Sequence, residues 1–170
     1  MTLPLSFIQT LPKTDLHVHL DGSLRISTLL ELAEEQGVEL PAKDPEGLSR
    51  ALSLGQNTGS LVEYLKAFDT TLKVMQTEDA LERIAYELGE DAARENVWYM
   101  EVRYAPMLHT RQGLRVTQVV EAVLAGLWRA QQEHGIESAV ILCGIRNISP
   151  QSSLEMAELA VAYKGRGVVG

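Results

Sequence analysis

Apolar positions along this 170-residue chain follow two different spacings, which divide it into short strands and longer helices. Residues 13–19 alternate polar and apolar side chains, and residues 97–106 are rich in β-branched and aromatic side chains, so both are predicted strands. Residues 137–146 form a continuous apolar run, which is typical of a strand buried on both faces. Residues 167–170 are expected to begin a fourth strand.

Between these strands the apolar residues recur every three or four positions, which predicts amphipathic helices. At the start of the first helix, Thr28 and Glu31 have the spacing of a capping box. Residues 38–58 carry prolines and glycines at their borders and are expected to be irregular, with short helical pieces. The predicted helices cover residues 24–36, 60–75, 78–95 and 116–134, and a last one runs from Ser149 and Pro150 to about Tyr163.

Strands that alternate with helices imply parallel βα units. The chain has no internal repeat, low-complexity tract or linker-like stretch. We therefore expect residues 1–170 to belong to one domain without an internal boundary.

Composition narrows the class of partner. The net charge is -8 and no run of basic residues exceeds two, which argues against nucleic acid and anionic membrane surfaces as partners. The single cysteine, Cys143, excludes an intrachain disulfide and suits a reducing compartment. The first residues lack the features of a signal peptide, and no apolar run approaches the roughly 18 residues needed to span a bilayer. A soluble, cytoplasmic protein that acts on a small molecule is the expectation.

The first predicted strand places its chemistry on one face. Asp15, His17 and His19 lie on the same side because strand side chains alternate, and the two histidine backbones are about 7 Å apart. Such a pair either forms ordinary hydrogen bonds or converges on one ion, and neutral imidazoles suit zinc and iron-group metals. The pair ends its strand just before the turn at Asp21 and Gly22. Active sites of parallel α/β barrels gather at that end of the strands, which favours a metal.

Three charged residues have less decided roles. The carboxylate of Asp21, taken alone, is more simply interpreted as a cap for the following helix. Glu101 and Arg103 share one face of the second predicted strand. Since buried charges persist only when they are partnered, we expect these two to pair with each other or with neighbouring strands.

The stretch LPKTDLHVHLDGSL, residues 11–24, resembles the first strand and loop of the adenosine deaminases, a family of metal-dependent amidohydrolases. The similarity continues through residues 60–69, 84–109 and 134–147 and covers essentially the whole chain. HVHLDG together with EVRYAP and ILCGIR is highly specific to this family. The resemblance implies an α/β fold, the first half (about strands 1–4) of a TIM-type (β/α)8 barrel with inserted lid helices.

The resemblance also implies roles for individual residues. His17 and His19 match the first two ligands of one Zn2+ per complete active site, and His19 also lies next to the bound purine nucleoside. Asp21 matches a carboxylate that accepts a hydrogen bond from the ribose 5′-hydroxyl, which reverses the interpretation as a cap. The family has a hydrophobic lid over the purine, and the residues that match it are Leu61, Tyr64, Leu65 and Phe68. The alternative role for these four residues is packing of their helix on the barrel.

The activity implied is hydrolytic deamination of adenosine, and of 2′-deoxyadenosine, to inosine and ammonia in purine salvage. No catalytic residue proper is expected within the chain: the proton-shuttle glutamate, a second active-site histidine and the remaining zinc ligands would lie beyond Gly170. His109 and His134 are not expected to replace them. The chain alone should be inactive without the C-terminal half of the barrel or a complementary chain. The alternatives are a deaminase of adenine or an aminofutalosine-type nucleoside, or an inactive truncated fragment.

Overall fold

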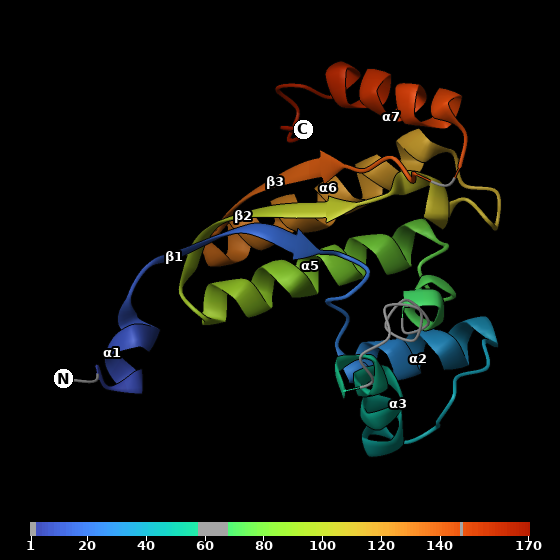
Figure 1. The fold of residues 1–170 in the computed structure, drawn as a ribbon. Helices are drawn as coiled ribbons and strands as arrows, with labels where there is room; N and C mark the ends of the chain where they lie inside the picture. The colour runs from blue at the N-terminus through green and yellow to red at the C-terminus, as the bar shows by residue number, and fades with distance from the viewer. Residues whose placement is uncertain (1–2, 58–67, 147) are drawn as a thin grey trace.

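A three-stranded parallel sheet lies at the centre of the computed structural model, which describes residues 3–57, 68–146 and 148–170 (Figure 1). Its strands, in spatial order, are β1 (Lys13–His19), β2 (Val97–Tyr104) and β3 (Glu137–Leu142). The end of the chain continues the sheet, because the amide of Val140 donates to the carbonyl of Gly167 at 2.8 Å. The first three predicted strands are confirmed, although β3 ends four residues earlier than expected, and at the expected fourth strand the structure has only isolated bridges to Val168.

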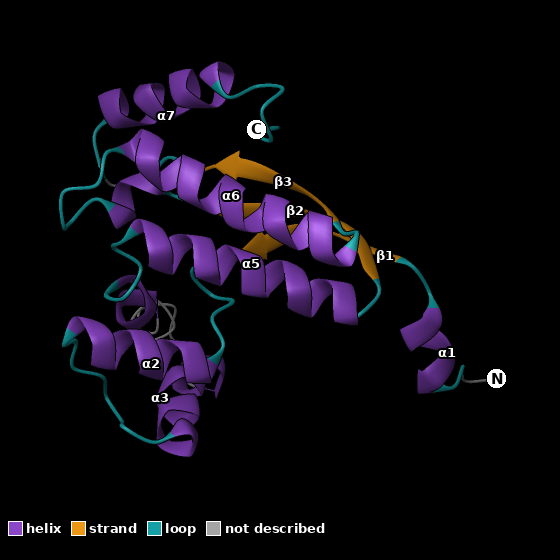
Figure 2. Cartoon of the chain, turned by 180° about the vertical axis from the view of Figure 1, so that it is seen from behind, coloured by secondary structure: helices purple, strands orange, loops and turns teal. Residues whose placement is uncertain are grey.

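Two long helices cover one face of the sheet: α5 (Glu78–Arg94) and α6 (Val116–His134) (Figure 2). They approach closely where α6 carries Gly126, since a Cβ atom there would lie 2.1 Å from the carbonyl oxygen of Glu82 on α5. A third helix, α7 (Pro150–Ala162), follows β3 and begins at Ser149, whose side chain accepts from the amide of Ser152. All three helices agree with the sequence pattern.

The side chains of β2 divide between the two faces of the sheet. Met100, Val102 and Tyr104 are buried beneath the helices, whereas the alternating Tyr99, Glu101 and Arg103 stay partly exposed on the other face. No helix of the described ranges lies in front of that second face in Figure 1. Parallel strands with helices on one side only are what the first half of a (β/α)8 barrel provides, since the other face becomes the barrel interior.

Two further helices, α2 (Ile26–Gln36) and α3 (Pro45–Asn57), lie beyond the carboxyl end of β1 (Figure 1). The prediction of an irregular segment with short helical pieces at residues 38–58 underestimates α3, which is one continuous helix of 13 residues. Asp44 caps this helix by accepting from the amide of Gly47 at 2.8 Å, Pro45 occupies the first turn, and Leu48 is fully buried.

The predicted capping box is also wrong. The helix α2 begins after Arg25, and Thr28 lies inside it, where its hydroxyl donates to Glu87 of α5 at 2.5 Å. A short helix that the pattern did not predict, α1 (Leu5–Thr10), precedes β1 at the opposite end of the strand (Figure 1). Of the predicted helix 60–75, the described part is helical only over residues 68–72. Within the described ranges, no helix is both long and apolar enough to cross a membrane.

Candidate metal and substrate site

The two histidines of the HVH motif lie at the carboxyl end of β1, on the face of the sheet that α5 and α6 leave open. The ring centres of His17 and His19 are 5.4 Å apart and the ring planes are inclined by 46°. Two imidazoles bound to one tetrahedral zinc ion, at Zn–N distances of about 2.0–2.1 Å, have centres about 5 Å apart. The spacing therefore fits a shared metal. Among the described residues, no three His, Cys, Asp or Glu side chains gather around one point, so this part of the chain offers two ligands.

Arg103 approaches this pair from the neighbouring strand, where the sheet register places it beside His19. Its Nη1 lies 3.1 Å from Nδ1 and 3.3 Å from Nε2 of His17, and its Nη2 donates to Sγ of Cys143 at 3.5 Å. The carboxylate of Glu101 instead accepts from the hydroxyl of Tyr99 at 3.0 Å. Arg103 and Glu101 therefore do not pair with each other. Arg103 instead contacts the neighbouring strand β1, which was the other possibility expected from the sequence.

Asp21 follows His19 in the loop after β1, and its side chain is only 13% exposed. Its Oδ1 lies 3.7 Å from Nδ1 of His19 and receives no hydrogen bond from the described residues. Burial raises the pKa of this carboxyl above its usual value, against the opposing effect of His19. The helix α2 begins only at Ile26, after Arg25, so Asp21 does not cap it. A buried acceptor without a donor suits a ligand hydroxyl.

Phe68 forms an apolar wall beside the histidines. Its ring centre lies 6.2 Å from that of His19, in an edge-on arrangement. A Cβ atom built on Gly22 would lie 3.3 Å from Cε1 of Phe68, so the ring lies against the loop after β1. Leu61, Tyr64 and Leu65, the other expected purine contacts, lie outside the described residues. Of the four, the structure thus places Phe68 at the site.

Thr71 fixes the segment that carries Phe68, and sequence reasoning missed it. Its hydroxyl lies 2.7 Å from the carbonyl oxygen of Asp21 and 3.0 Å from that of Phe68. The side chain of Gln76 adds a second link, because its Nε2 donates to the carbonyls of Leu72 and Leu108, at 2.7 and 3.0 Å. The segment is therefore bound to the loops that follow both β1 and β2.

The two remaining histidines have structural surroundings. His109 is fully buried, and its Nδ1 lies 3.0 Å from the carbonyl oxygen of Met75. Burial lowers the pKa of His109 to about 4, so the ring is neutral near physiological pH. His134 ends α6, with its Nε2 3.2 Å from the hydroxyl of Tyr86.

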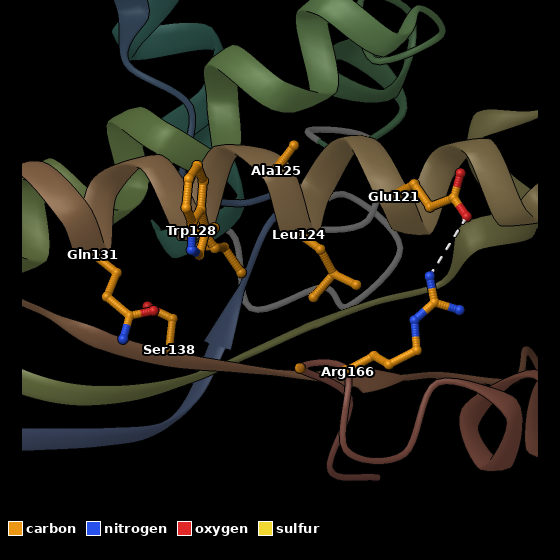
Figure 3. A pocket seen from close by; sticks show the side chains of 9 residues that line it. Glu121, Leu124, Ala125, Trp128, Gln131, Ser138 and Arg166 are labelled. Carbon is orange, nitrogen blue, oxygen red and sulfur yellow. Dashed lines mark ion pairs between the residues drawn. The ribbon is translucent and has the colours of Figure 1, made fainter.

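A separate cavity of about 490 Å³ lies on the side of the sheet that the helices cover, between α6 and the turn at Arg166 and Gly167 (Figure 3). Leu124 and Trp128 of α6 line it together with Ser138 of β3. At the other end of the cavity, Nη2 of Arg166 lies 4.0 Å from Oε1 of Glu121. None of the HVH motif, Asp21 or Phe68 lines this cavity.

Comparison with known sequences identifies relatives of this chain. A family model described as adenosine deaminase matches residues 12–170. An adenosine deaminase of Clostridium botulinum is 43% identical over 159 residues, which are 94% of this chain and 48% of the relative. A probable adenosine deaminase of Dictyostelium discoideum is 43% identical over 98% of this chain and 22% of its own length. The chain thus spans about half the length, or less, of these relatives.

Solved structures give the same result for the fold. An Arabidopsis N6-mAMP deaminase matches with a TM-score of 0.80 and 35% identity, over 97% of this chain and 50% of that one. An adenine deaminase from Arthrobacter aurescens matches with a TM-score of 0.78 and 27% identity, over 90% of this chain and 46% of that one. An amidohydrolase from Burkholderia ambifaria with bound Zn matches with a TM-score of 0.81 and 25% identity, over 97% and 44%. Each match covers about half of the solved chain.

Proposed function

Since the chain belongs to the adenosine deaminase family, we propose that it forms the first half of a zinc-dependent active site that hydrolyses adenosine to inosine and ammonia. The observation that carries the proposal is the convergence of Asp21 and Phe68 on His19, at the carboxyl end of β1. This end of the strands is where (β/α)8 enzymes bind their substrates.

His17 and His19 would hold the zinc ion, together with ligands from the second half of the barrel. Their ring spacing of 5.4 Å supports this assignment, as does the bound Zn of the Burkholderia relative. Zinc in such a site lowers the pKa of water from about 15.7 to about 7 and so makes hydroxide available at neutral pH. A neutral imidazole nitrogen is the chemistry that this ion requires of the chain.

The other side chains would bind and orient the nucleoside. Asp21 accepts a hydrogen bond from the ribose 5′-hydroxyl, because the Oδ1 atom of its buried carboxylate has no donor among the described residues. Phe68, which lies beside His19, would contact the purine there and exclude water from the reacting carbon. Proton transfer to the purine is left to an acid from the second half of the barrel.

Asp21 also favours a nucleoside over a nucleotide. A 5′-phosphate would bring its own negative charge against this buried carboxylate, which costs binding energy in a poorly solvated site. By contrast, a related Arabidopsis protein was solved in complex with the nucleotide IMP. A free base such as adenine would instead leave the carboxylate without a partner. Adenosine and 2′-deoxyadenosine are therefore the proposed substrates, and the proposed role is purine salvage.

The proposal is tested by supplying the missing half. The chain is co-expressed with the C-terminal half of the Clostridium botulinum relative, and the purified pair is offered adenosine, adenine and AMP in parallel. The pair should release ammonia from adenosine in preference to the other two, and the chain alone should release none. Preference for AMP or adenine would contradict the assigned substrate, and no activity on any of the three would indicate a non-catalytic fragment.

A further inference from the structure

Thr71 carries a buried hydroxyl at the point where the segment of Phe68 meets the loop of Asp21. The residue is 6% exposed and lies in the helical stretch 68–72. A threonine inside a helix usually donates to a carbonyl three or four positions earlier, and the carbonyl oxygen of Phe68 lies 3.0 Å away. The carbonyl oxygen of Asp21 is nearer, at 2.7 Å, the usual length of a hydroxyl hydrogen bond. Because a hydroxyl has one proton, the bond to Asp21 is the stronger of two competing bonds.

The carbonyl group of Asp21 depends on this donor. Among the described residues, no other donor forms a hydrogen bond with it. The rest of the loop is held from elsewhere, since the amide of Leu20 donates to the carbonyl of Arg103 at 3.1 Å and the amide of Ser23 donates to the carbonyl of Leu20 at 3.2 Å. Thr71 therefore orients the peptide that follows Asp21. The backbone dihedral angles decide which side-chain rotamers are allowed, so this bond also bears on the direction of the carboxylate.

The segment that follows Thr71 is fixed independently of its hydroxyl. The carbonyl of Val74 accepts from Nε2 of Gln36, on α2, at 2.9 Å. Oε1 of Gln76 accepts from a backbone amide in the segment after β2, also at 2.9 Å. Thr71 therefore acts from a fixed base, and loss of its hydroxyl should disturb the loop of Asp21 before it disturbs the fold.

We propose that Thr71 is a positioning residue that sets the carboxylate of Asp21 relative to the ring of Phe68, so that the site selects a nucleoside with a free 5′-hydroxyl. The inference rests on the proposed function, in which Phe68 contacts the purine and Asp21 binds the ribose. The distance between these two side chains must match one substrate molecule. The ring of Phe68 lies against Gly22, and the hydroxyl of Thr71 adds a polar link beside this contact. A misdirected Asp21 would weaken the bond to the ribose without changing the contacts with the purine.

The test compares adenosine with 5′-deoxyadenosine, which differ only in the hydroxyl that Asp21 would bind. The assay uses the co-expressed pair, and the readout is the ratio of kcat/KM for the two nucleosides. This ratio does not depend on how much of a variant is folded, because both nucleosides are offered to the same preparation. Loss of a purely structural contact would lower both values and leave the ratio unchanged.

Thr71→Val removes the hydroxyl at nearly the same volume and should lower the ratio by about fivefold, the value of one hydrogen bond. Thr71→Ala should lower it equally with a smaller side chain, and Thr71→Ser, which keeps the hydroxyl, should retain it. Thr70→Val, at the partly exposed neighbouring position, is the matched control and should leave the ratio unchanged. In an Asp21→Ala background, Thr71→Val should lower the ratio no further, because the two changes remove the same contact.

A ratio that stays the same in Thr71→Val, or that falls as far in Thr71→Ser, would overturn the positioning role. A further fall in the Asp21→Ala background would also overturn it, since Thr71 would then act by another route. The dissociation constants of the two nucleosides, measured by isothermal titration, separate this inference from the proposed function. A pair that releases no ammonia, but binds adenosine more tightly than 5′-deoxyadenosine only while Thr71 keeps its hydroxyl, would refute the proposed function and leave the positioning role standing. A pair that releases ammonia without distinguishing the two nucleosides in either measurement would do the reverse.

Discussion

Arg103 contacts the ring of His17 across two strands, with Nη1 3.1 Å from Nδ1 and 3.3 Å from Nε2. A neutral imidazole has one lone pair for an acceptor role, and its other nitrogen carries a proton. Because Nη1 is nearly equidistant from both ring nitrogens, the guanidinium lies over the ring and not along one in-plane lone pair, and it brings a positive charge to the place where a metal ion would bind. Arg103 and the metal therefore compete for His17.

This competition predicts that Arg103→Ala increases the affinity of the completed, metal-free barrel for zinc by about tenfold, the order of one charge repulsion in a partly solvated site. Isothermal titration with zinc measures the change. Tyr99→Phe, on the same face of β2, is the control and should leave the affinity unchanged, since Tyr99 contacts Glu101. Weaker zinc binding in Arg103→Ala would show that Arg103 supports the metal.

A second prediction concerns Asp21 and the ribose. In the completed barrel, Asp21→Ala should lower kcat/KM for adenosine by about 10- to 100-fold, because a charged hydrogen bond to the 5′-hydroxyl is lost. The loss should disappear with 5′-deoxyadenosine, which has no such hydroxyl. Asp21→Asn keeps an acceptor but removes the charge, so it should raise the activity on AMP relative to adenosine. Equal losses with adenosine and 5′-deoxyadenosine would argue that Asp21 acts only on the fold.

A third prediction concerns acid stability. The pKa of His109 is lowered by burial to about 4 from an unfolded value of 6.5, so protons bind the unfolded state more tightly. The contribution of this residue to stability is complete above pH 6.5 and is lost as the pH falls toward 4. The completed barrel should lose about 2 kcal/mol of unfolding free energy through His109 between about pH 7 and about pH 5.

His109→Gln should abolish most of this loss, because glutamine does not titrate and still offers an N–H to Met75. Urea unfolding at the two pH values measures the difference, with His134→Gln, at the end of α6, as the control. An acid-dependent loss that is the same in His109→Gln and in the unmodified protein would contradict the assignment.

Local patterns predicted the regular elements well. The strands β1 and β2 and the helices α5 and α6 begin within a residue of their predicted starts, because each has a clear periodicity over its whole length. The helix α3 is longer than the short helical pieces expected there, since Gly47 and Gly55, which favour a loop in the sequence pattern, lie inside a helix that starts at Asp44 and Pro45.

The site was only partly predictable for a different reason. Strand alternation placed His17 and His19 on one face, and the structure confirms that their rings lie together. The contact of Arg103 with His17 and the bond from Thr71 to Asp21 join residues 86 and 50 positions apart. Such contacts depend on strand register and on loop packing, which no local periodicity encodes.

We propose that His17 and His19 supply half of a zinc site that works only in a completed barrel. Its most direct test is the zinc content of the purified pair, measured together with the rate of adenosine deamination. We expect one zinc ion per pair. Both the zinc and the activity should be lost in the double variant His17→Ala with His19→Ala, but not in His134→Ala. A pair that keeps its zinc or its activity without the two histidines would contradict it.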